Sequence, residues 1–323
     1  MRVRFWGVRG SCPAPATRED IQSRLQAALH EFGRTSSPPD LSDETSVADW
    51  VAALPPRINS CAGGNTPCVE MRTDDGEVFI IDLGTGARGL GHALMEEDFA
   101  HGHGRAHIFL SHYHWDHIQG WPFFRPVYVR GNRFDFYTRH DPPEERLRAQ
   151  QMPPFFPSSS WNDMNADIAY HEMSAEPLLL CDGQMRVTSL ELDHPSRAWA
   201  YRFECGGKVF VYASDGAYYQ LTPQSMQPYV DFFRDADLLI FDAQFTLVES
   251  FAKRTWGHSS AVVGVELACA ANAKKLALFH HDPSADDAAL EHLLSVGEQY
   301  SRILGCENRC EILLAREGLS LEL

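Results

Sequence analysis

The run Ser111-His112-Tyr113-His114-Trp115-Asp116-His117 holds the side chains whose types and spacing best suit metal chemistry. Three imidazoles and a carboxylate fall within this short stretch, directly after the apolar run Ile108-Phe109-Leu110. Imidazole with carboxylate suits Zn, Mn or Fe(II), and the lack of thiolates argues against a purely structural zinc site. Residues two apart in an extended segment share a face, so His112 and His114 can face one ion. Asp116 and His117 can serve a neighbouring ion if the chain turns between the two pairs.

Three more candidate ligands follow apolar runs later in the chain, where each could also be an ordinary turn or capping residue. His194 follows a run that ends in Leu192-Asp193, Asp215 follows one that ends in Ala213-Ser214, and His280 comes directly after Phe279. Together they are the ligands that an open two-metal site requires, and Asp215 has two oxygens with which to bridge the ions. A bridging hydroxide would then be the nucleophile, because bound metals lower the pKa of water.

Two other residues have both a functional and an ordinary interpretation. Asp82 ends an apolar run and precedes a glycine turn, so it could orient ligand histidines or simply cap that turn. His258 opens a helical pattern, where it could act as a general acid, stabilise an oxyanion, or cap the helix. His101 and His103 lie between glycines without a carboxylate, which predicts a surface turn rather than a metal site.

The composition limits the classes of function. The net charge of −16 disfavours a broad nucleic-acid footprint, although a small anionic substrate remains compatible because bound cations reverse the local field. The sequence shows no signal-peptide pattern and no apolar run long enough for a membrane helix, so we expect a cytoplasmic enzyme without a membrane partner. The eight cysteines are scattered; we expect them to be reduced, with the closest pair, Cys306 and Cys310, structural.

Strand-like runs recur along the chain with helical patterns between some of them, and many are apolar on both faces, as in sheets covered by helices. We expect a single domain over 1–323, with an N-terminal insert at about 13–58 and a lid-like insert at about 133–176. The N-terminal insert would cover the site edge or form a homodimer contact. The lid contains an aromatic and Pro-rich stretch from which Phe155, Phe156 and Trp161 are predicted to contact substrate.

His112-x-His114-x-Asp116-His117 resembles the HxHxDH signature of the metallo-β-lactamase superfamily. Phe5-Trp6-Gly7-Val8-Arg9-Gly10-Ser11, the segments 63–68 and 82–86, and Gly257-His258-Ser259 are similar to its ribonuclease Z and phosphodiesterase-like branch. The resemblance implies an α/β fold, a four-layer αββα sandwich with two mixed sheets flanked by helices. The signature is specific for the fold and says little about the substrate.

The resemblance also implies roles for single residues. His112, His114 and His194 would hold one ion, while Asp116, His117 and His280 would hold the other. Asp215 would bridge the two divalent ions, with zinc expected ahead of Mn or Fe. Asp116 would also accept a proton from the attacking water, and His258 would assist the scissile phosphate and the leaving group. No Gly- or Lys-rich arm for gripping transfer RNA is present.

These observations predict a hydrolase that cleaves a phosphodiester bond in a small substrate such as a cyclic nucleotide. Two alternatives stay open. The same site could attack the carbonyl of a thioester, lactone or β-lactam, or the chain could be a non-catalytic, metal-stabilised sensing module. The second is disfavoured because all seven expected ligands are present.

Overall fold

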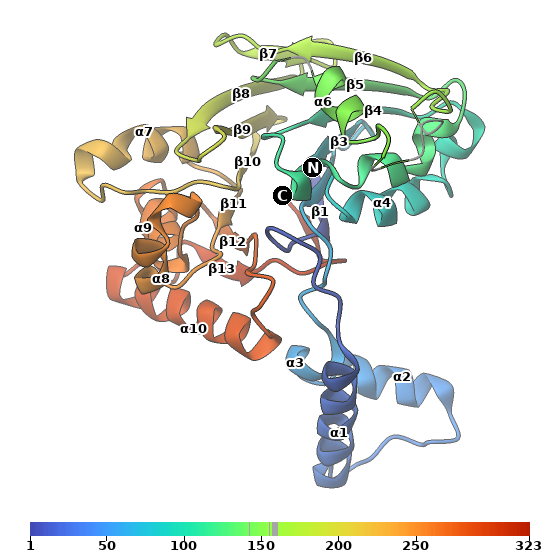
Figure 1. Cartoon of the computed structure of the whole chain (residues 1–323). Helices are drawn as coiled ribbons and strands as arrows, with labels where there is room; N and C mark the ends of the chain where they lie inside the picture. The colour runs from blue at the N-terminus through green and yellow to red at the C-terminus, as the bar shows by residue number, and fades with distance from the viewer. Residues whose placement is uncertain (142, 155, 157–160) are drawn as a thin grey trace.

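Two mixed β-sheets form the centre of the protein (Figure 1). The computed structural model describes residues 1–141, 143–154, 156 and 161–323, and within these residues each sheet has seven strands. The first sheet has the order β14 (Ser320–Glu322), β1 (Arg2–Gly7), β2 (Cys68–Arg72), β3 (Val78–Ile81), β4 (Arg105–Phe109), β5 (Arg133–Thr138) and β6 (Asp167–Glu172). The second has the order β13 (Glu311–Leu314), β12 (Lys275–Phe279), β11 (Leu238–Asp242), β10 (Lys208–Ala213), β9 (Ala198–Cys205), β8 (Met185–Leu192) and β7 (Leu178–Leu180).

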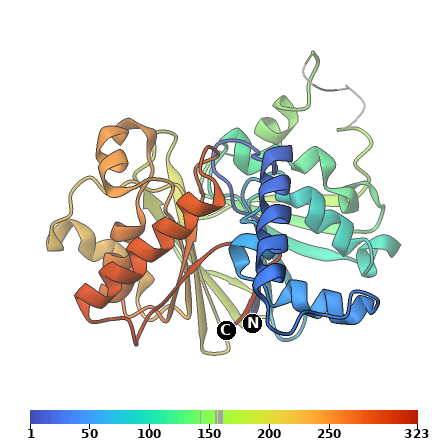
Figure 2. The ribbon, with the colours of Figure 1, turned by 90° about the horizontal axis from the view of Figure 1, so that it is seen from below.

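Each sheet contains a parallel half that ends toward the same part of the molecule. Strands β3 to β6 pair in parallel in the first sheet, and β10 to β13 do so in the second. The remaining pairs are antiparallel. β14 pairs with β1, so the two chain ends lie side by side (Figure 2).

Helices cover the outer face of each sheet. α7 (Pro223–Phe233), α8 (Leu247–Ala252), α9 (Ala261–Ala270) and α10 (Asp287–Leu304) lie on the side of the second sheet, and α4 (Gly86–Leu94) and the short α5 (Trp115–Ile118) on the side of the first (Figure 1). The chain therefore forms the expected four-layer αββα sandwich. No helix of the described residues is both long and apolar enough to cross a bilayer.

Aromatic side chains fill the space between the sheets. Phe79 and Phe109 from the first sheet meet Phe203 from the second, and the ring centroids of Phe109 and Phe203 lie 5.0 Å apart. All three side chains are fully buried. Since edge-to-face aromatic pairs bury large apolar areas, this layer fixes one sheet on the other and so fixes the loops at their ends.

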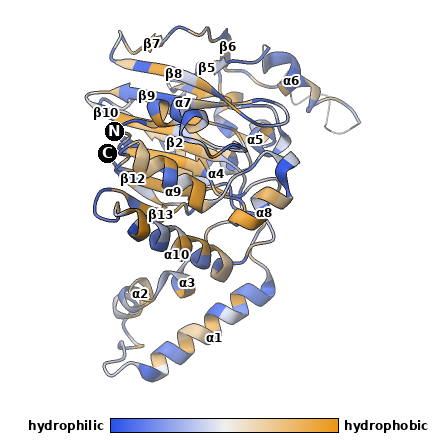
Figure 3. Ribbon diagram, turned by 90° about the vertical axis from the view of Figure 1, so that its left-hand side faces the viewer, coloured by the Kyte–Doolittle hydropathy of each residue, from blue (hydrophilic) through white to orange (hydrophobic). Residues whose placement is uncertain are grey.

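The N-terminal insert stands away from the sandwich (Figures 1 and 3). It contains α1 (Arg18–Arg34), α2 (Glu44–Ala52) and α3 (Pro56–Asn59). Thr17 caps α1 with a capping box, but the helix buries none of its residues, and Leu25 and Leu29 are exposed. Arg24 makes an ion pair with Asp287 at the start of α10. The insert makes few contacts with the sandwich. Leu25 and Leu29 form an exposed apolar stripe on α1, and a homodimer contact through this stripe remains a prediction.

The segment 133–176, which we predicted to be a lid-like insert, includes two strands of the first sheet. It begins with β5 and ends with β6, which pair with each other in the first sheet. Between them lies α6 (Pro143–Ala149). Only the connection between these two strands can therefore form a lid, because the strands themselves are part of the sheet.

The cysteines correct one expectation. We expected all of them to be reduced, but Cys306 forms a disulfide with Cys269, which connects the end of α9 to the residue after the α10 C-cap. Among the described residues, six other cysteines are free, including Cys310. The pairing joins positions 37 apart in sequence, so local spacing gave no signal for it.

Candidate metal centre

The candidate ligands collect at the ends of strands from both sheets. The run after β4 supplies one group of them, and the others follow β8, β10, β11 and β12. Residues at this edge of the sandwich are Asp82, His112, His114, Asp116, His117, His194, Asp215, Asp242, His258 and His280. All of the metal-ligating residues that the sequence predicts are therefore brought together.

Three of these positions have an unusual backbone. Asp82 after β3, Asp215 after β10 and His280 after β12 have φ angles of 60°, 60° and 59°. A non-glycine residue rarely adopts this left-handed conformation, and it persists only where the surroundings enforce it. In each case the turn ends the strand at once and directs a carboxylate or imidazole across the edge of the sheets.

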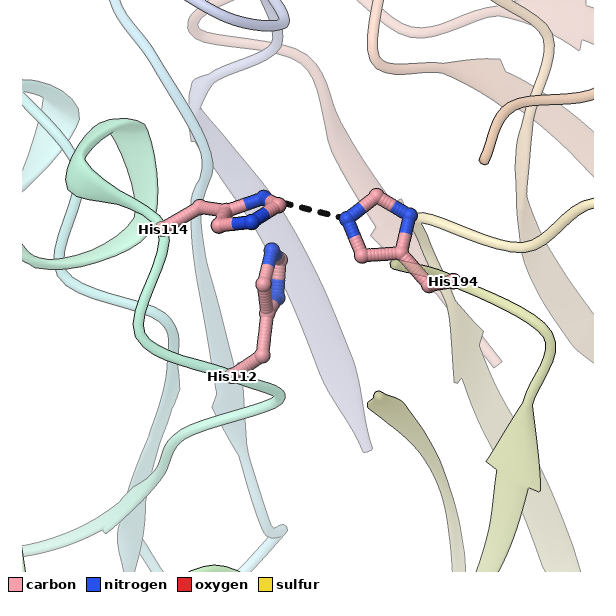
Figure 4. Close-up of side chains that lie close together, drawn as sticks. All are labelled: His112, His114 and His194. Atoms are coloured by element: carbon pink, nitrogen blue, oxygen red, sulfur yellow. Dashed lines mark hydrogen bonds between the residues drawn. The ribbon is translucent and has the colours of Figure 1, made fainter. Parts of the chain in front are cut away.

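The first cluster consists of three imidazoles, His112, His114 and His194 (Figure 4). One ring nitrogen of each lies within 4.8 Å of the others, and Nε2 of His194 is 3.0 Å from Nδ1 of His114. Nδ1 of His194 donates to the carbonyl of Gly257 at 2.9 Å, which leaves its Nε2 free to ligate. Nε2 of His112 is buried without a hydrogen-bond partner. Such a nitrogen fits a divalent ion, because burying an unpaired polar atom is otherwise costly.

The second cluster consists of Asp116, His117 and His280. An oxygen of Asp116 lies 3.4 Å from Nε2 of His117 and 3.2 Å from Nε2 of His280. Asp215 lies between the clusters, with oxygens 3.2 Å from Nε2 of His117 and 3.9 Å from Nε2 of His112. One carboxylate thus reaches both groups of imidazoles, as a bridging ligand must.

Asp82 is buried beneath the clusters and accepts hydrogen bonds from several donors. Nδ1 of His117 donates to it at 2.7 Å, as do the hydroxyls of Ser111 and Tyr212. The backbone N–H of Ser111 donates at 2.8 Å. This carboxylate therefore fixes the ring of His117 with Nε2 toward the second cluster, and the structure places it where an orienting residue would be.

Asp242 is a residue of the site that the sequence interpretation missed. It is fully buried at the end of β11 and accepts a 2.8 Å hydrogen bond from Nδ1 of His258. The backbone N–H of Asp215 donates to the same carboxylate at 3.1 Å. Asp242 follows the apolar run 238–241, the same strand-end signal that pointed to Asp82 and Asp215.

The pKa shifts differ between the two clusters: burial lowers the pKa of the three histidines of the first cluster, whereas carboxylates act on the histidines of the second. Burial alone would lower the pKa of His280, but Asp215, Asp116 and Asp242 outweigh it and raise that pKa to about 9. Burial would likewise lower the pKa of His117, yet the carboxylates around it raise the value well above the usual range. Burial would raise the pKa of Asp215, while His280 and His117 hold it well below normal. The carboxylates therefore favour positive charge here, which protons or divalent cations can supply.

A cavity of about 490 Å³ opens over the two clusters. Its lining includes His258 and the exposed residues Trp115 and Trp256. Among the residues that line it there is no lysine or arginine. Its complete lining is Ser11, His114, Trp115, Asp116, Pro195, Asp215, Thr255, Trp256, His258 and His280.

Phe156 and Trp161, two of the aromatic residues predicted to contact substrate, do not line this cavity. Phe156 lies against Phe123, with ring centroids 5.8 Å apart, and Trp161 packs on the apolar cluster beneath the first sheet. Phe155 lies outside the described residues. The Pro-rich sequence did not indicate which way its aromatic side chains would point. Trp115, which lies within the ligand run 111–117, does line the cavity.

The family model described as "Beta-lactamase superfamily domain" matches residues 79–281. A curated Ribonuclease Z from Haloferax volcanii is 26% identical over 262 residues, covering 66% of this chain and 78% of that protein. The metallo-beta-lactamase fold protein YhfI from Bacillus subtilis has a TM-score of 0.62 at 18% identity, covering 100% of this chain and 98% of that one. A diphosphatase from the PhnP family has a TM-score of 0.57 at 19% identity, with 100% and 97% covered.

Proposed function

The chain belongs to the beta-lactamase superfamily, and we propose that this metal-dependent hydrolase cleaves a phosphodiester bond in a small substrate. One observation carries the proposal: a His258–Asp242 pair lies at the wall of a small cavity whose floor contains two ligand clusters that share Asp215. The Ribonuclease Z relative and the diphosphatase neighbour support phosphate chemistry.

The residues fit two divalent ions, for which we propose zinc. His112, His114 and His194 would hold one ion, Asp116, His117 and His280 the other, and Asp215 would bridge them. Bound ions there would polarise a phosphate oxygen and make water a stronger nucleophile near neutral pH. Manganese or iron would suit the same ligands, and metal analysis of the purified protein distinguishes the three.

In this proposal, Asp116 accepts a proton from the attacking water. One of its oxygens accepts a 2.8 Å hydrogen bond from the backbone N–H of Ser11 and also contacts the rings of His117 and His280. Both Ser11 and Asp116 line the cavity. The N–H bond fixes the carboxylate, so a substrate-side water meets it in a defined orientation.

We assign His258 the role of assisting the leaving group. Its Nδ1 donates to Asp242, so Nε2 is the nitrogen that remains for a ligand in the cavity. Asp242 in turn accepts from the backbone N–H groups of Asp215, Gln244 and Ser259, which fixes its position. A proton on Nε2 could pass to the oxygen that leaves phosphorus, while Asp242 stabilises the charged imidazole.

The cavity favours a small substrate over extended nucleic acid. Its volume of about 490 Å³ lies within the range of small-molecule sites. The exposed rings of Trp115 and Trp256 at its walls offer faces on which a planar group such as a nucleobase or an aryl ring can stack. With a net charge of −16 and no basic lining residue, the surface gives an RNA backbone little to bind.

A panel of substrates tests the proposal. Zinc-loaded protein should hydrolyse a bis-aryl phosphate and cyclic nucleotides faster than thioesters, lactones or a β-lactam. His258→Ala should reduce the phosphodiesterase rate by about 10²–10⁴-fold, the usual contribution of a general acid, and leave zinc content unchanged. Faster turnover of a carbonyl substrate would replace this function with carbonyl hydrolysis on the same centre. Metal-loaded protein that turns over none of them would reject the enzymatic assignment.

A further inference from the structure

Three metal-ligand side chains meet at a second place in the described chain, away from the metal centre. Glu77, His107 and Cys181 each offer a ligand atom, and the three atoms lie within 4.8 Å of one another. We propose that they bind one further divalent ion of the zinc class, which joins the two sheets. The site would be separate from the proposed hydrolytic centre in both place and ligand chemistry.

The three residues come from both sheets. Glu77 closes the turn between β2 and β3, and His107 lies within β4, whose partner on one side is β3. Both elements belong to the first sheet, whereas Cys181 lies in the turn between β7 and β8 of the second. An ion held by all three would therefore crosslink the sandwich, much as a disulfide connects distant segments.

Hydrogen bonds hold each ligand in place before any ion binds. The backbone of Glu77 is fixed by Thr73, whose hydroxyl accepts from the N–H of Glu77 at 3.0 Å. Cys181 has a φ of 52°, in a turn closed by hydrogen bonds around it. Asp182 has a φ of 53° as well, so Cys181 belongs to a tight hairpin turn between β7 and β8 that fixes its position.

His107 carries the support that metal-bound histidines usually have. Its Nδ1 lies 3.2 Å from the hydroxyl of Tyr137, which leaves Nε2 available to an ion. Its ring also stacks on Phe79, with centroids 4.9 Å apart. Burial lowers the pKa of His107 and so favours the neutral imidazole that ligation requires.

The surrounding charge favours a cation. Burial raises the pKa of the Cys181 thiol to about 11, and Glu77, Asp75 and Asp182 add to that effect. The same negative groups that oppose a thiolate attract a divalent ion. On binding, the thiol loses its proton to solvent and the sulfur becomes a thiolate ligand. Thiolate, imidazole and carboxylate together are donors that zinc accepts, and water can fill a fourth position.

Cobalt substitution tests the site directly, because the hydrolytic centre has no sulfur ligand. Protein stripped with a chelator and reloaded with Co(II) should show a sulfur-to-cobalt charge-transfer band in the near ultraviolet. Cys181→Ser should lose the band and bind one ion fewer per chain, while its phosphodiesterase rate stays that of the wild type. Tyr137→Phe should retain the band but weaken this ion's binding by about 10–100-fold.

Cys205→Ser is the matched control, since Cys205 is also half-buried and lies close enough to Cys181 to affect its pKa. This variant should keep both the band and the full ion count. A wild-type protein without the band, or a band that survives in Cys181→Ser, would overturn the proposal. The charge-transfer band and the ion count do not depend on which substrate the hydrolytic centre accepts. Failure of the proposed function would instead appear in the substrate panel.

Discussion

The metal centre and the N-terminal insert are built in opposite ways. At the centre, Asp82 alone accepts bonds from the side chains of His117, Ser111 and Tyr212 and is fully buried. In the insert, α1 has no buried residue, and Arg24 makes a single partly buried ion pair with Asp287. Dense, buried hydrogen bonding makes a region intolerant of single changes, whereas an exposed helix loses little when one residue changes. The difference predicts a gradient of mutational effects from one region to the other.

Asp215→Asn should have the largest effect, because it removes the carboxylate that faces both clusters. We expect the hydrolytic rate to fall by about 10³-fold or more, since the metal contribution to such reactions is several kcal/mol. The measurement is the turnover rate together with bound metal by mass spectrometry. Asn at the same position keeps the volume, so normal circular dichroism with lost activity identifies a chemical role. Retained activity would show that Asp215 does not bridge.

Asp82→Asn should have the second-largest effect, and it should lower metal affinity rather than the rate of the chemical step. The amide nitrogen would oppose the donors from Ser111, Tyr212 and His117, so the His117 ring would lose its fixed orientation. Loss of such an orienting partner typically weakens metal binding by about 10–100-fold. Competition with a chromogenic chelator measures the affinity. Unchanged affinity would mean that Asp82 only ends β3. Asp231→Asn, at an exposed ion pair with Arg234, is the control.

Acid should weaken metal binding through His280. Its pKa is raised to about 9 by Asp215, Asp116 and Asp242 against the effect of burial, so the ring is protonated at pH 7 before an ion binds. Ligation needs the neutral ring, so binding at pH 7 should release a proton, and affinity should rise with pH until about 9. The slope is roughly tenfold per pH unit for each proton displaced. Calorimetry in buffers of different ionisation enthalpy counts the protons. An affinity that stays constant between pH 6 and 9 would contradict this.

The smallest effect is expected in the insert. Leu25 is 60% exposed on α1, so Leu25→Gln should change the free energy of unfolding by no more than about 0.5 kcal/mol. Leu90→Ala, at a fully buried position in α4, is the contrasting variant and should cost about 2–5 kcal/mol. Thermal unfolding measures both. A large loss in Leu25→Gln, accompanied by a lower mass in light scattering, would show that a second copy of the chain covers this stripe.

The strand-end ligands could be predicted because their signal is local. His194, Asp215 and His280 each follow an apolar run, and the structure brings them to one edge. Asp242 carries the same signal but was passed over, because the expected ligand set was already complete without it. Its role depends on the contact with His258, which is 16 residues away, and such a partner is visible only after folding.

Other features could not be predicted because they depend on long-range packing. β5 reads Arg133-Phe-Asp-Phe-Tyr-Thr138, an alternating strand pattern, yet the charged and Pro-rich residues that follow it favoured a lid. The directions of Phe156 and Trp161 depend on the apolar surface beneath the first sheet, where one of them packs. The Cys269–Cys306 disulfide likewise requires α9 and α10 to lie side by side.

The left-handed backbone at Asp82, Asp215 and His280 has a consequence for selection. This conformation costs a non-glycine residue about 1–2 kcal/mol, and glycine adopts it freely. A glycine at one of these positions would relieve that strain while removing a group on which the centre depends. Selection of variants for thermal stability alone would therefore favour glycine at these three positions, and hydrolytic activity would fall. If the proposed hydrolysis depends on these groups, the aspartates and histidine there serve the chemistry at the expense of folding stability.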